Sequence, residues 1–512
     1  MNTGSVKFGS IVVLGGCLSG CLVGPNYHRP AVPVPAQFAE LPGWTAAAPA
    51  DAAPKGDWWI DFNDPLLDEL EPKVVVSNQT VRQAYANYQQ ALAEVKVARA
   101  QLFPILGING SVTRTGGPAA GTAGAAGTTA AGVRSSGSVI NAGSLEGTAS
   151  WTPDLWGSVR RLIEENSATA QADQATLANA ALSEQTLLAT TVIELRLADA
   201  DIDLEQQTVA AYRDALRVTE QQATAGITAT PPSAVITARV ALETAQASLI
   251  GLGVARAQYA HAVAVLVGKN PEELDIPHSK IMPTLPDIPV GVPSTLLERR
   301  PDIAAAERTM AAQNAAIGIA VAAYYPTLSL SAAAGFTQQP LDGLLHTANH
   351  VWSLGANGTE TLFEFGERHA EVAAARAAYE GAVASYRGTV LSAFQDVEND
   401  LSGLRILAEQ AKALDVAVSD AIRGTQIALA EFQAGTVDYT TVATAQEVQL
   451  TNQQSAITVQ QNRLVDTVNL IGDLGGGWSA AQLYDPRHPR GRQPADVSAA
   501  ASPAGASRPA AQ

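Results

Sequence analysis

The sequence predicts a mostly helical chain with a small β part, built from one structural unit that occurs twice. Residues 98–106 and 320–328 are similar to each other, with Pro104 opposite Pro326 at an offset of 222. From Ser158 to Thr224 there is neither proline nor glycine, so helix is the economical interpretation of these 67 residues. Short segments that contain glycine, serine and threonine, with the alternation of side chains that is typical of strands, lie between the predicted helices. A long-helix fold with an internal repeat follows.

Two further matches define the repeated unit. Leu155-Trp156-Gly157 faces Glu364-Phe365-Gly366, and Ala225-Gly226-Ile227 faces Ala434-Gly435-Thr436, both at an offset of 209. The two offsets differ because a loop in the first half is longer. The predicted unit is a helix, two short strands, a very long helix, a tight turn and a returning helix.

Composition narrows the class of protein. Among 512 residues, 16% are charged and 5% aromatic, which suits long helices packed through small side chains. The net charge of −17 argues against nucleic acid as a partner. The two cysteines, Cys17 and Cys21, are both near the start, so a disulfide or a thiolate metal site in the body is excluded.

Residues 1–20 are predicted to be a lipoprotein signal peptide. Lys7 supplies the positive start, an apolar run follows, and Leu18-Ser19-Gly20-Cys21 has the form of a bacterial lipobox. Cleavage there would leave Cys21 to be lipid-modified. Cys17 ends a competing box with a shorter apolar run. Leu22 follows the cysteine where an aspartate would favour retention in the inner membrane, so the outer membrane is expected.

The first copy is predicted over residues 74–268, after an N-terminal lipidated tether and equatorial segment at 21–73. Residues 74–103 lack glycine and proline and are predicted to form one helix that Pro104 ends. Two strands are predicted before the long helix, at 105–114 and 144–153. Residues 115–143 between them are predicted to be a flexible loop.

Heptad spacing indicates how the long helices pack. In each copy an apolar residue recurs every seven positions, as in a coiled coil; the residues are Leu188, Leu195, Ile202, Val209 and Leu216, then Val390, Val397, Leu404, Ala411 and Val418. At 1.5 Å per residue, 67 residues span roughly 100 Å. Gly226 and Gly435 break the rods, and helices 233–267 and 438–472 return, so each tip is a helical hairpin.

Membrane crossing is expected to use strands. After the leader, no segment offers the ~20 uninterrupted apolar residues of a spanning helix. Four strands per chain do not close a barrel with a useful lumen, and an open sheet in lipid leaves unpaired edges. Several chains that share one barrel would remove those edges and would also bundle the rods.

Four motifs together resemble the TolC-type outer-membrane factor family, in its lipoprotein branch. They are Cys21-Leu-Val-Gly24-Pro25-Asn-Tyr27-His-Arg29-Pro30, Trp58-Trp59-Ile-Asp-Phe62-Asn-Asp64-Pro65-Leu66, Trp151-Thr-Pro-Asp154-Leu-Trp156-Gly157, and Leu296-Leu297-Glu-Arg299-Arg300-Pro301-Asp302-Ile303 with Ala306-Glu307. The resemblance covers roughly residues 18–478. In the last motif, Pro301 suits the first turn of a helix and Asp302 its positive end; a dedicated functional ion pair is the alternative.

The resemblance implies a homotrimer with a periplasmic α-barrel and a transmembrane β-barrel of twelve strands, four from each chain. Such a trimer is the passive exit duct of a tripartite efflux system, which carries small molecules from an inner-membrane transporter, through a periplasmic adaptor, across the outer membrane. The family places its tips against the adaptor, here Ala225, Gly226, Ile227, Ala434, Gly435 and Thr436. The linker between copies is expected at 269–300, the second copy at 301–478 and a disordered tail at 479–512.

The chain departs from the family at the periplasmic aperture. Members commonly carry a ring of aspartates just after the second tip, where this sequence has Thr444, and Thr441 takes another acidic position. Asp438, beside Tyr439, is the nearest carboxylate. We therefore expect either weak cation block or a ring displaced to Asp438; the alternative is that Asp438 is a solvated helix-start residue.

Two other classes of protein fit the sequence less well than a channel. An enzyme is disfavoured because the sequence has no Walker loop, no dinucleotide-binding glycine motif after a strand and no His-Glu-x-x-His, and no cofactor is expected. His346 and His350 have helical spacing, but two ligands alone do not make a metal site. A trimeric coiled-coil adhesin or structural lipoprotein would share the lipidation and the heptads, but would not need paired strands and hairpin tips in both copies.

Overall fold

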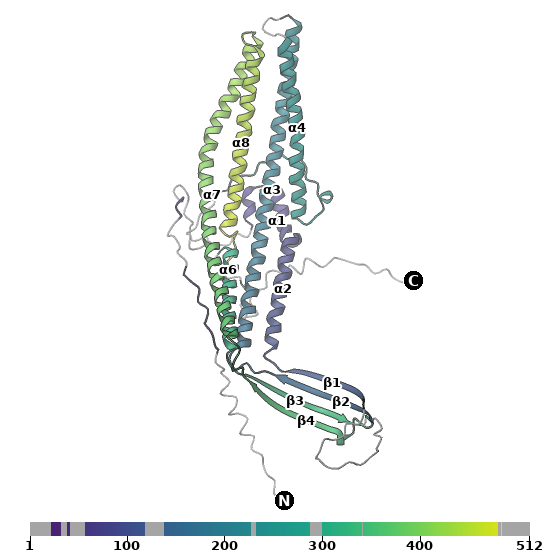
Figure 1. Cartoon of the computed structure of the whole chain (residues 1–512). Coiled ribbons are helices and arrows are strands. Elements are labelled where there is room, and N and C mark those ends of the chain that lie inside the picture. Colours follow the sequence, from purple (N-terminus) through teal and green to yellow (C-terminus); the bar gives the residue numbers. More distant parts are fainter. Residues whose placement is uncertain are drawn as a thin grey trace, which may run out of the picture. The chain divides into compact units, whose positions relative to one another are not determined.

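The computed structural model describes residues 22–31, 38–40, 57–117, 138–226, 232–286, 299–339, 341–479 and 483. It contains the predicted unit twice (Figure 1). The first copy consists of α2 (Gln79–Ala100), β1 (Ile105–Gly117), β2 (Ser138–Trp151), α3 (Ser158–Thr224) and α4 (Pro232–Leu266). The second consists of α6 (Pro301–Ala322), β3 (Thr327–Gln338), β4 (His350–Thr359), α7 (Glu367–Gln433) and α8 (Tyr439–Asp473). Before them come η2 (Trp58–Phe62) and α1 (Pro65–Ser77); η3 (Pro271–Glu273) follows α4, and η5 (Thr347–Asn349) precedes β4.

The strand pairing confirms the repeat at the level of single residues. The strands form one antiparallel sheet in the order β1-β2-β3-β4. Ile105 pairs with Ser150 within the first copy, and Thr327 pairs with Thr359 within the second. These pairs are related by the same offsets of 222 and 209 that the sequence shows, so the two hairpins have equivalent registers.

The chain divides into two compact units that do not follow the two copies. The sheet unit takes its residues from Met1–His28, Ala91–Thr169 and Met310–Ala382. The helical unit takes its residues from Arg29–Gln90, Ala170–Thr309 and Val383–Gln512. Each unit therefore combines segments from both copies of the repeat.

The single helix expected at 74–103 is wrong, because Asn78 separates two helices there. Asn78 has extended backbone angles and ends α1, and its side-chain oxygen accepts hydrogen bonds from the backbone of Thr80 and Val81 at the start of α2. Its amide donates to Glu184 and to the carbonyl of Leu266, at 2.8 and 3.0 Å. A buried capping residue thus interrupts a run that lacks glycine and proline.

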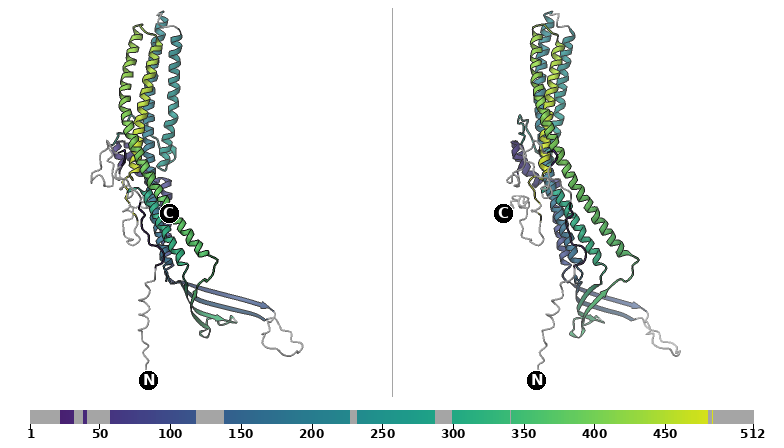
Figure 2. Two further views of the ribbon diagram at one scale, coloured as in Figure 1. Left: turned by 60° about the vertical axis from the view of Figure 1, so that its left-hand side comes forward. Right: turned by 90° about the vertical axis from the view of Figure 1, so that its left-hand side faces the viewer.

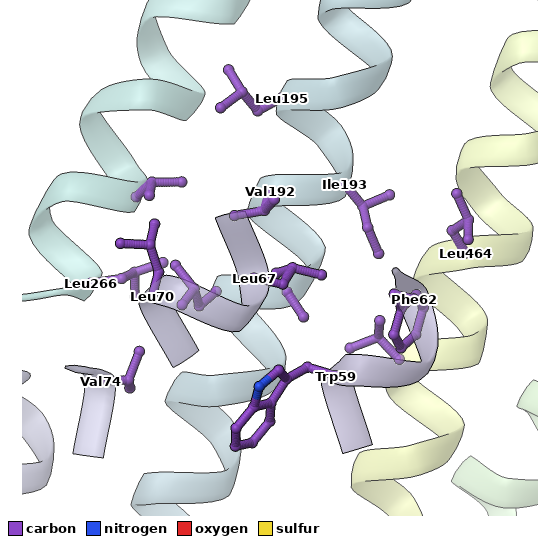
Figure 3. Close-up of a cluster of buried hydrophobic side chains, with 14 of the residues drawn as sticks. Trp59, Phe62, Leu67, Leu70, Val74, Val192, Ile193, Leu195, Leu266 and Leu464 are labelled. Carbon is purple, nitrogen blue, oxygen red and sulfur yellow. The ribbon is translucent and has the colours of Figure 1, made fainter. Parts of the chain in front are cut away.

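The helical unit has an apolar core in which η2 and α1 pack against three longer helices (Figure 3). Trp59 and Phe62 of η2 and Leu67 of α1 are buried beside Ile193 of α3, with Leu266 of α4 and Leu464 of α8 in the same cluster. The heptad residues Leu188 and Leu195 belong to this core, so the predicted coiled-coil face points inward. Asp64 caps α1 and forms a fully buried, bidentate ion pair with Arg196, at 2.7 and 3.0 Å.

Figure 2 shows α4 alongside the later part of α3, and α8 alongside the later part of α7. Val209 and Tyr212 of α3 pack on Leu242 and Ala245 of α4, which confirms the first predicted hairpin. By length and composition alone, α4 could cross a membrane, contrary to the expectation that no such segment follows the leader. One such helix is weak evidence of a membrane span, and α4 has the place in the first copy that α8 has in the second.

The N-terminal segment, expected to be an extended tether, is held against helices where it is described. In the sheet unit, Arg161 of α3 donates to the carbonyls of Val23 and Gly24 and to the side chain of Asn26. Gly24 has a φ of +88°, and a Cβ there would lie 2.5 Å from the Cα of Gly318 in α6. Glycine in this motif is therefore required by a close backbone approach.

Candidate functional site

The two tips end their long helices in the same way, at a glycine with positive φ. Gly226 has a φ of 71° and Gly435 a φ of 75°. After α7, the amides of Gly435 and Thr436 donate to the carbonyls of Phe432 and Glu431, which is the Schellman arrangement of a helix end. After α3, the amide of Gly226 donates to the carbonyl of Ala223 in the equivalent bond. Apart from the chain neighbours, no described residue has an atom within 4 Å of a Cβ built at either glycine.

An apolar cluster ties the two hairpins together below the tips. Ala215 of α3, Ala238 of α4, Phe432 of α7, and Tyr439 and Val442 of α8 are buried in one cluster. The rings of Phe432 and Tyr439 meet edge to face, with centroids 5.8 Å apart. Four helices from both copies thus hold the turns in place.

Asp438 is the N-cap residue of α8 and immediately precedes its first residue, Tyr439. Its Oδ1 accepts hydrogen bonds from the backbone amide and the hydroxyl of Thr441, both at 3.2 Å, and from the hydroxyl of Thr440. The hydrogen bond from Thr440, followed by the one from the Thr441 amide, lowers the pKa of Asp438. The carboxylate is exposed, so it is charged at neutral pH and has a capping function whether or not it also acts on ions.

The four residues expected at the aperture do not share one environment. Thr441 and Thr444 are exposed and line a groove of about 710 Å³ between α7 and α8, with Asp420 and Glu431 of α7 on its other side. Tyr439 is instead fully buried, and among the described residues its hydroxyl has no hydrogen-bond partner. Burial raises the pKa of Tyr439 to about 12. Within one chain, therefore, the Tyr439 ring lies in the apolar cluster, whereas Thr441 and Thr444 face the groove.

Two of the expected site residues lie outside the described residues: Cys21, the expected lipidation site, and Ile227 of the first tip. The histidine pair gives no support for a metal. His350 packs edge-on against Phe336 with ring centroids 5.9 Å apart, and the described residues contain no cluster of three potential ligands.

A polar cavity in the helical unit was missed by sequence reasoning. It measures about 450 Å³ and is lined by residues of α3, α6, α7 and α8. Arg300 forms ion pairs across it with Asp302, Asp473 and Asp396, at 2.8, 3.0 and 3.7 Å. Burial, followed by the negative charge of Asp473, raises the pKa of Asp400 to about 8. The motif around Arg300 predicted a helix start, which α6 confirms by beginning at Pro301, with an ion pair as the alternative; Arg300 forms such pairs just before that start.

Comparison with known proteins decides the family. A model of the family described as outer membrane efflux protein matches residues 72–269 and 292–476, which is most of the chain. The chain belongs to the outer membrane efflux protein family. Its members are channels rather than enzymes, which agrees with the resemblance in the motifs.

Relatives and solved structures agree over nearly the whole length of this efflux protein. It is 30% identical to the solvent efflux pump outer membrane protein SrpC of Pseudomonas putida over 474 residues, 91% of this chain and 97% of the relative. It is 29% identical to the probable efflux pump outer membrane protein TtgC of Pseudomonas putida KT2440 over 471 residues, 92% and 95% of the two chains. The structure of the outer-membrane channel OprN is similar with a TM-score of 0.81 at 27% identity, covering 90% of this chain and all of that one.

The environment of Asp438 leads to a prediction about ion conduction. Because threonines replace the expected aspartates, we expect multivalent cations on the periplasmic side to block the channel weakly, or to block it through Asp438. Single-channel recording with increasing concentrations of a trivalent cation measures this. Asp438→Ala also removes the cap, whereas Asp438→Ser keeps a capping oxygen without charge, so the serine variant isolates the charge. Strong block that survives both substitutions would contradict the prediction.

Proposed function

We propose that three copies of this chain form the passive outer-membrane exit duct of a tripartite efflux pump. The observation that carries the proposal is the sheet, in which β1 and β4 each pair on one side only within the described residues. In lipid, an open edge leaves backbone groups without hydrogen bonds. Three sheets joined edge to edge would remove every open edge and would form one barrel of twelve strands.

The helical hairpins support a proposal about which surface binds partner proteins. Each long helix turns back at a glycine tip, and the two tips share one apolar cluster. We propose that the tips dock a periplasmic adaptor, which connects the duct to an inner-membrane transporter that supplies the energy. The relatives named as outer-membrane components of efflux pumps support this arrangement.

Ion conduction tests the proposed duct directly. Purified trimers added to a planar lipid bilayer should give stepwise increases of current, each from one inserted channel. A structural or adhesive lipoprotein would insert or bind without conducting. Trimers that are shown to insert, by recovery from the bilayer lipid, and that give no current would overturn the proposal.

The lipid anchor is a separate part of the proposal and rests on the Leu18-Ser19-Gly20-Cys21 box. We expect Cys21→Ser to abolish acylation and signal cleavage, and Cys17→Ser to leave both intact. Several acyl chains on one terminus anchor stably, whereas a single chain binds marginally. Mass spectrometry of the mature N-terminus reads the result. Acyl groups on Cys17 of the unaltered protein would show that the site is assigned wrongly.

The tips are expected to contribute to export by presenting a surface to the adaptor, not by stabilising the fold. Gly226→Phe and Gly435→Phe should reduce export to the background level. Trimers should still reach the outer membrane, because no described residue apart from the chain neighbours lies within 4 Å of the added Cβ. Both glycines have positive φ, where a phenylalanine costs about 1–2 kcal/mol. Asparagine tolerates this conformation better, so Gly435→Asn is the matched control and should retain most export. Loss of the trimer in the phenylalanine variants would indicate a folding defect instead.

A further inference from the structure

One contact in the sheet unit joins the two copies of the repeat. Trp156, which follows β2, stacks on Tyr325, which precedes β3, with ring centroids 4.8 Å apart. The indole Nε1 donates to the carbonyl of Pro326 at 2.7 Å. The strands on either side pair as well, with Ser150 opposite Ser331. The first copy thus meets the second through a ring stack and a strand ladder.

The repeat assigns an equivalent to each of these residues. Trp156 corresponds to Phe365 at the offset of 209, and Tyr325 corresponds to Phe103 at the offset of 222. The equivalence holds in the backbone, because Gly157 and Gly366 have φ values of 85° and 89°. Phe365 therefore occupies, between β4 and α7, the position that Trp156 occupies between β2 and α3.

Among the described residues, Phe365 and Phe103 do not stack on each other as Trp156 and Tyr325 do. Phe365 is 92% exposed and Phe103 is 67% exposed, whereas Tyr325, which is covered by Trp156, is 38% exposed. Phe365 also has a φ of 52°, which is rare for an aromatic residue and persists where surroundings hold it. Its described ring contact is with Phe363. An exposed aromatic residue in this conformation indicates a surface that a partner covers.

We infer that the contact between neighbouring copies of this chain repeats the contact between its own two halves, with Phe365 of one protomer stacked on Phe103 of the next. The inference rests on the trimeric assembly proposed above and adds which residues meet and in which register. The side chain of phenylalanine has no N–H group, so this contact has no counterpart of the bond from the Trp156 indole to the Pro326 carbonyl. The junction between protomers is then held by ring contact and strand pairing.

The same offsets specify the register between protomers. Within the chain, β2 and β3 pair over nine residue pairs, from Gly143 opposite Gln338 to Trp151 opposite Leu330. The pair Ser150 and Ser331 corresponds to Thr359 of β4 and Asn109 of β1. We place Thr359 of one protomer opposite Asn109 of the next, with antiparallel strands on either side of this pair. A shift by one residue would turn every side chain to the wrong face.

Cysteine cross-linking of the full-length protein in outer membranes tests this register. Oxidation of the double variant Thr359→Cys and Asn109→Cys should yield covalent dimers and trimers in denaturing electrophoresis without reductant. The displaced pair Thr359→Cys and Ser111→Cys should cross-link at least tenfold more slowly, because diagonal neighbours lie about 7–8 Å apart. The pair Ser150→Cys and Ser331→Cys is the control within one chain. Single-cysteine variants show whether Cys21 takes part.

The possible outcomes separate this inference from the proposed function. Preferential linkage of Thr359 to Asn109 supports the register. Preferential linkage of the displaced pair, or trimers by native mass measurement with no cross-link in either pair, overturns the register but leaves the trimer in place. Absence of any trimer overturns both the register and the proposed assembly.

The aromatic contact has its own test. Phe365→Ala and Phe103→Ala should each lower the temperature at which the trimer dissociates in detergent. If the two rings meet, the double variant should show a shift no larger than the larger single shift, because both substitutions remove one contact. Additive shifts, or unchanged dissociation temperatures for both single variants, would overturn the stacking.

Discussion

Replacing Arg300 with methionine is expected to lower the free energy of unfolding by about 3–5 kcal/mol at neutral pH. The Arg300 side chain is mostly buried, and its positive charge faces Asp302, Asp396 and Asp473 across the polar cavity. Without it, these carboxylates and Asp400 would remain close together in a partly buried site. Their mutual repulsion and their desolvation are the two sources of the loss.

The pH dependence of this loss gives a second readout. The pKa of Asp400, at about 8, and that of Asp473 both lie above the ordinary value, mainly because of burial. A carboxyl whose pKa is raised by folding binds a proton that the unfolded chain releases, so stability falls as the pH rises from about 4 to about 8. The Arg300→Met variant should show a steeper fall and should recover toward the unaltered protein at pH 5.

Denaturant unfolding in detergent at pH 5 and pH 8 measures both effects. The matched control is Arg217→Met, which removes an ion pair with Asp214 in which both side chains are mostly exposed. That control should change the free energy of unfolding by less than about 1 kcal/mol. Equal effects of the two substitutions, or a loss that is independent of pH, would show that Arg300 does not hold the cavity together.

The second large effect is a gain, expected when Glu71 is replaced by leucine. Glu71 on α1 is fully buried, and neither carboxyl oxygen has a hydrogen-bond partner among the described residues. Burial raises the pKa of Glu71 to about 9. The group is therefore protonated when folded at pH 7 but ionised when unfolded, which costs about 3 kcal/mol at roughly 1.4 kcal/mol per pKa unit.

The sign of the pH dependence follows from the raised pKa. Stability of the unaltered protein should fall as the pH rises from about 4.5 toward 9, and Glu71→Leu should remove this part of the slope. The gain from leucine is then largest at pH 8 and small at pH 4.5. Thermal unfolding over this pH range provides the measurement.

Two variants serve as controls for Glu71. Glu71→Gln should remove the same slope but keep the cost of a buried polar group, so it should be less stable than the leucine variant. Glu69 is exposed on the same helix, and a hydrogen bond from Lys73 lowers its pKa. Glu69→Gln should leave the slope unchanged. A slope that is identical in all three variants would mean that Glu71 does not titrate as proposed.

Local signals along the chain predicted much of the fold. The long helix was expected at 158–224, and α3 covers the same residues, because this run without proline or glycine lies between Gly157 and Gly226. The returning helices differ from their predicted bounds by one residue at each end. The repeat predicted four strands, and their pairing follows the sequence offsets. Glycine, proline and periodicity act within a few residues, so they can be read without knowing the fold.

Contacts between distant residues account for what was missed. Asn78 ends α1 because it also bonds to Glu184 and the Leu266 carbonyl, and both of these partners are more than 100 positions away. Tyr439 is buried because Phe432 of the other helix covers it. For the candidate site, the sequence located the tip glycines and Asp438, but not the groove beside Thr441 and Thr444 or the cavity around Arg300.

The sequence by itself determined the repeated unit, the ends of the long helices and the family, because each depends on residue types at short or fixed spacing. Only the tertiary structure decided which polar groups are buried, as with Glu71 and Asp400, and that the Gly24 motif is held by Arg161. Burial is a property of all the segments that pack around a side chain. A carboxylate therefore looks the same in sequence whether water or a hydrophobic core surrounds it.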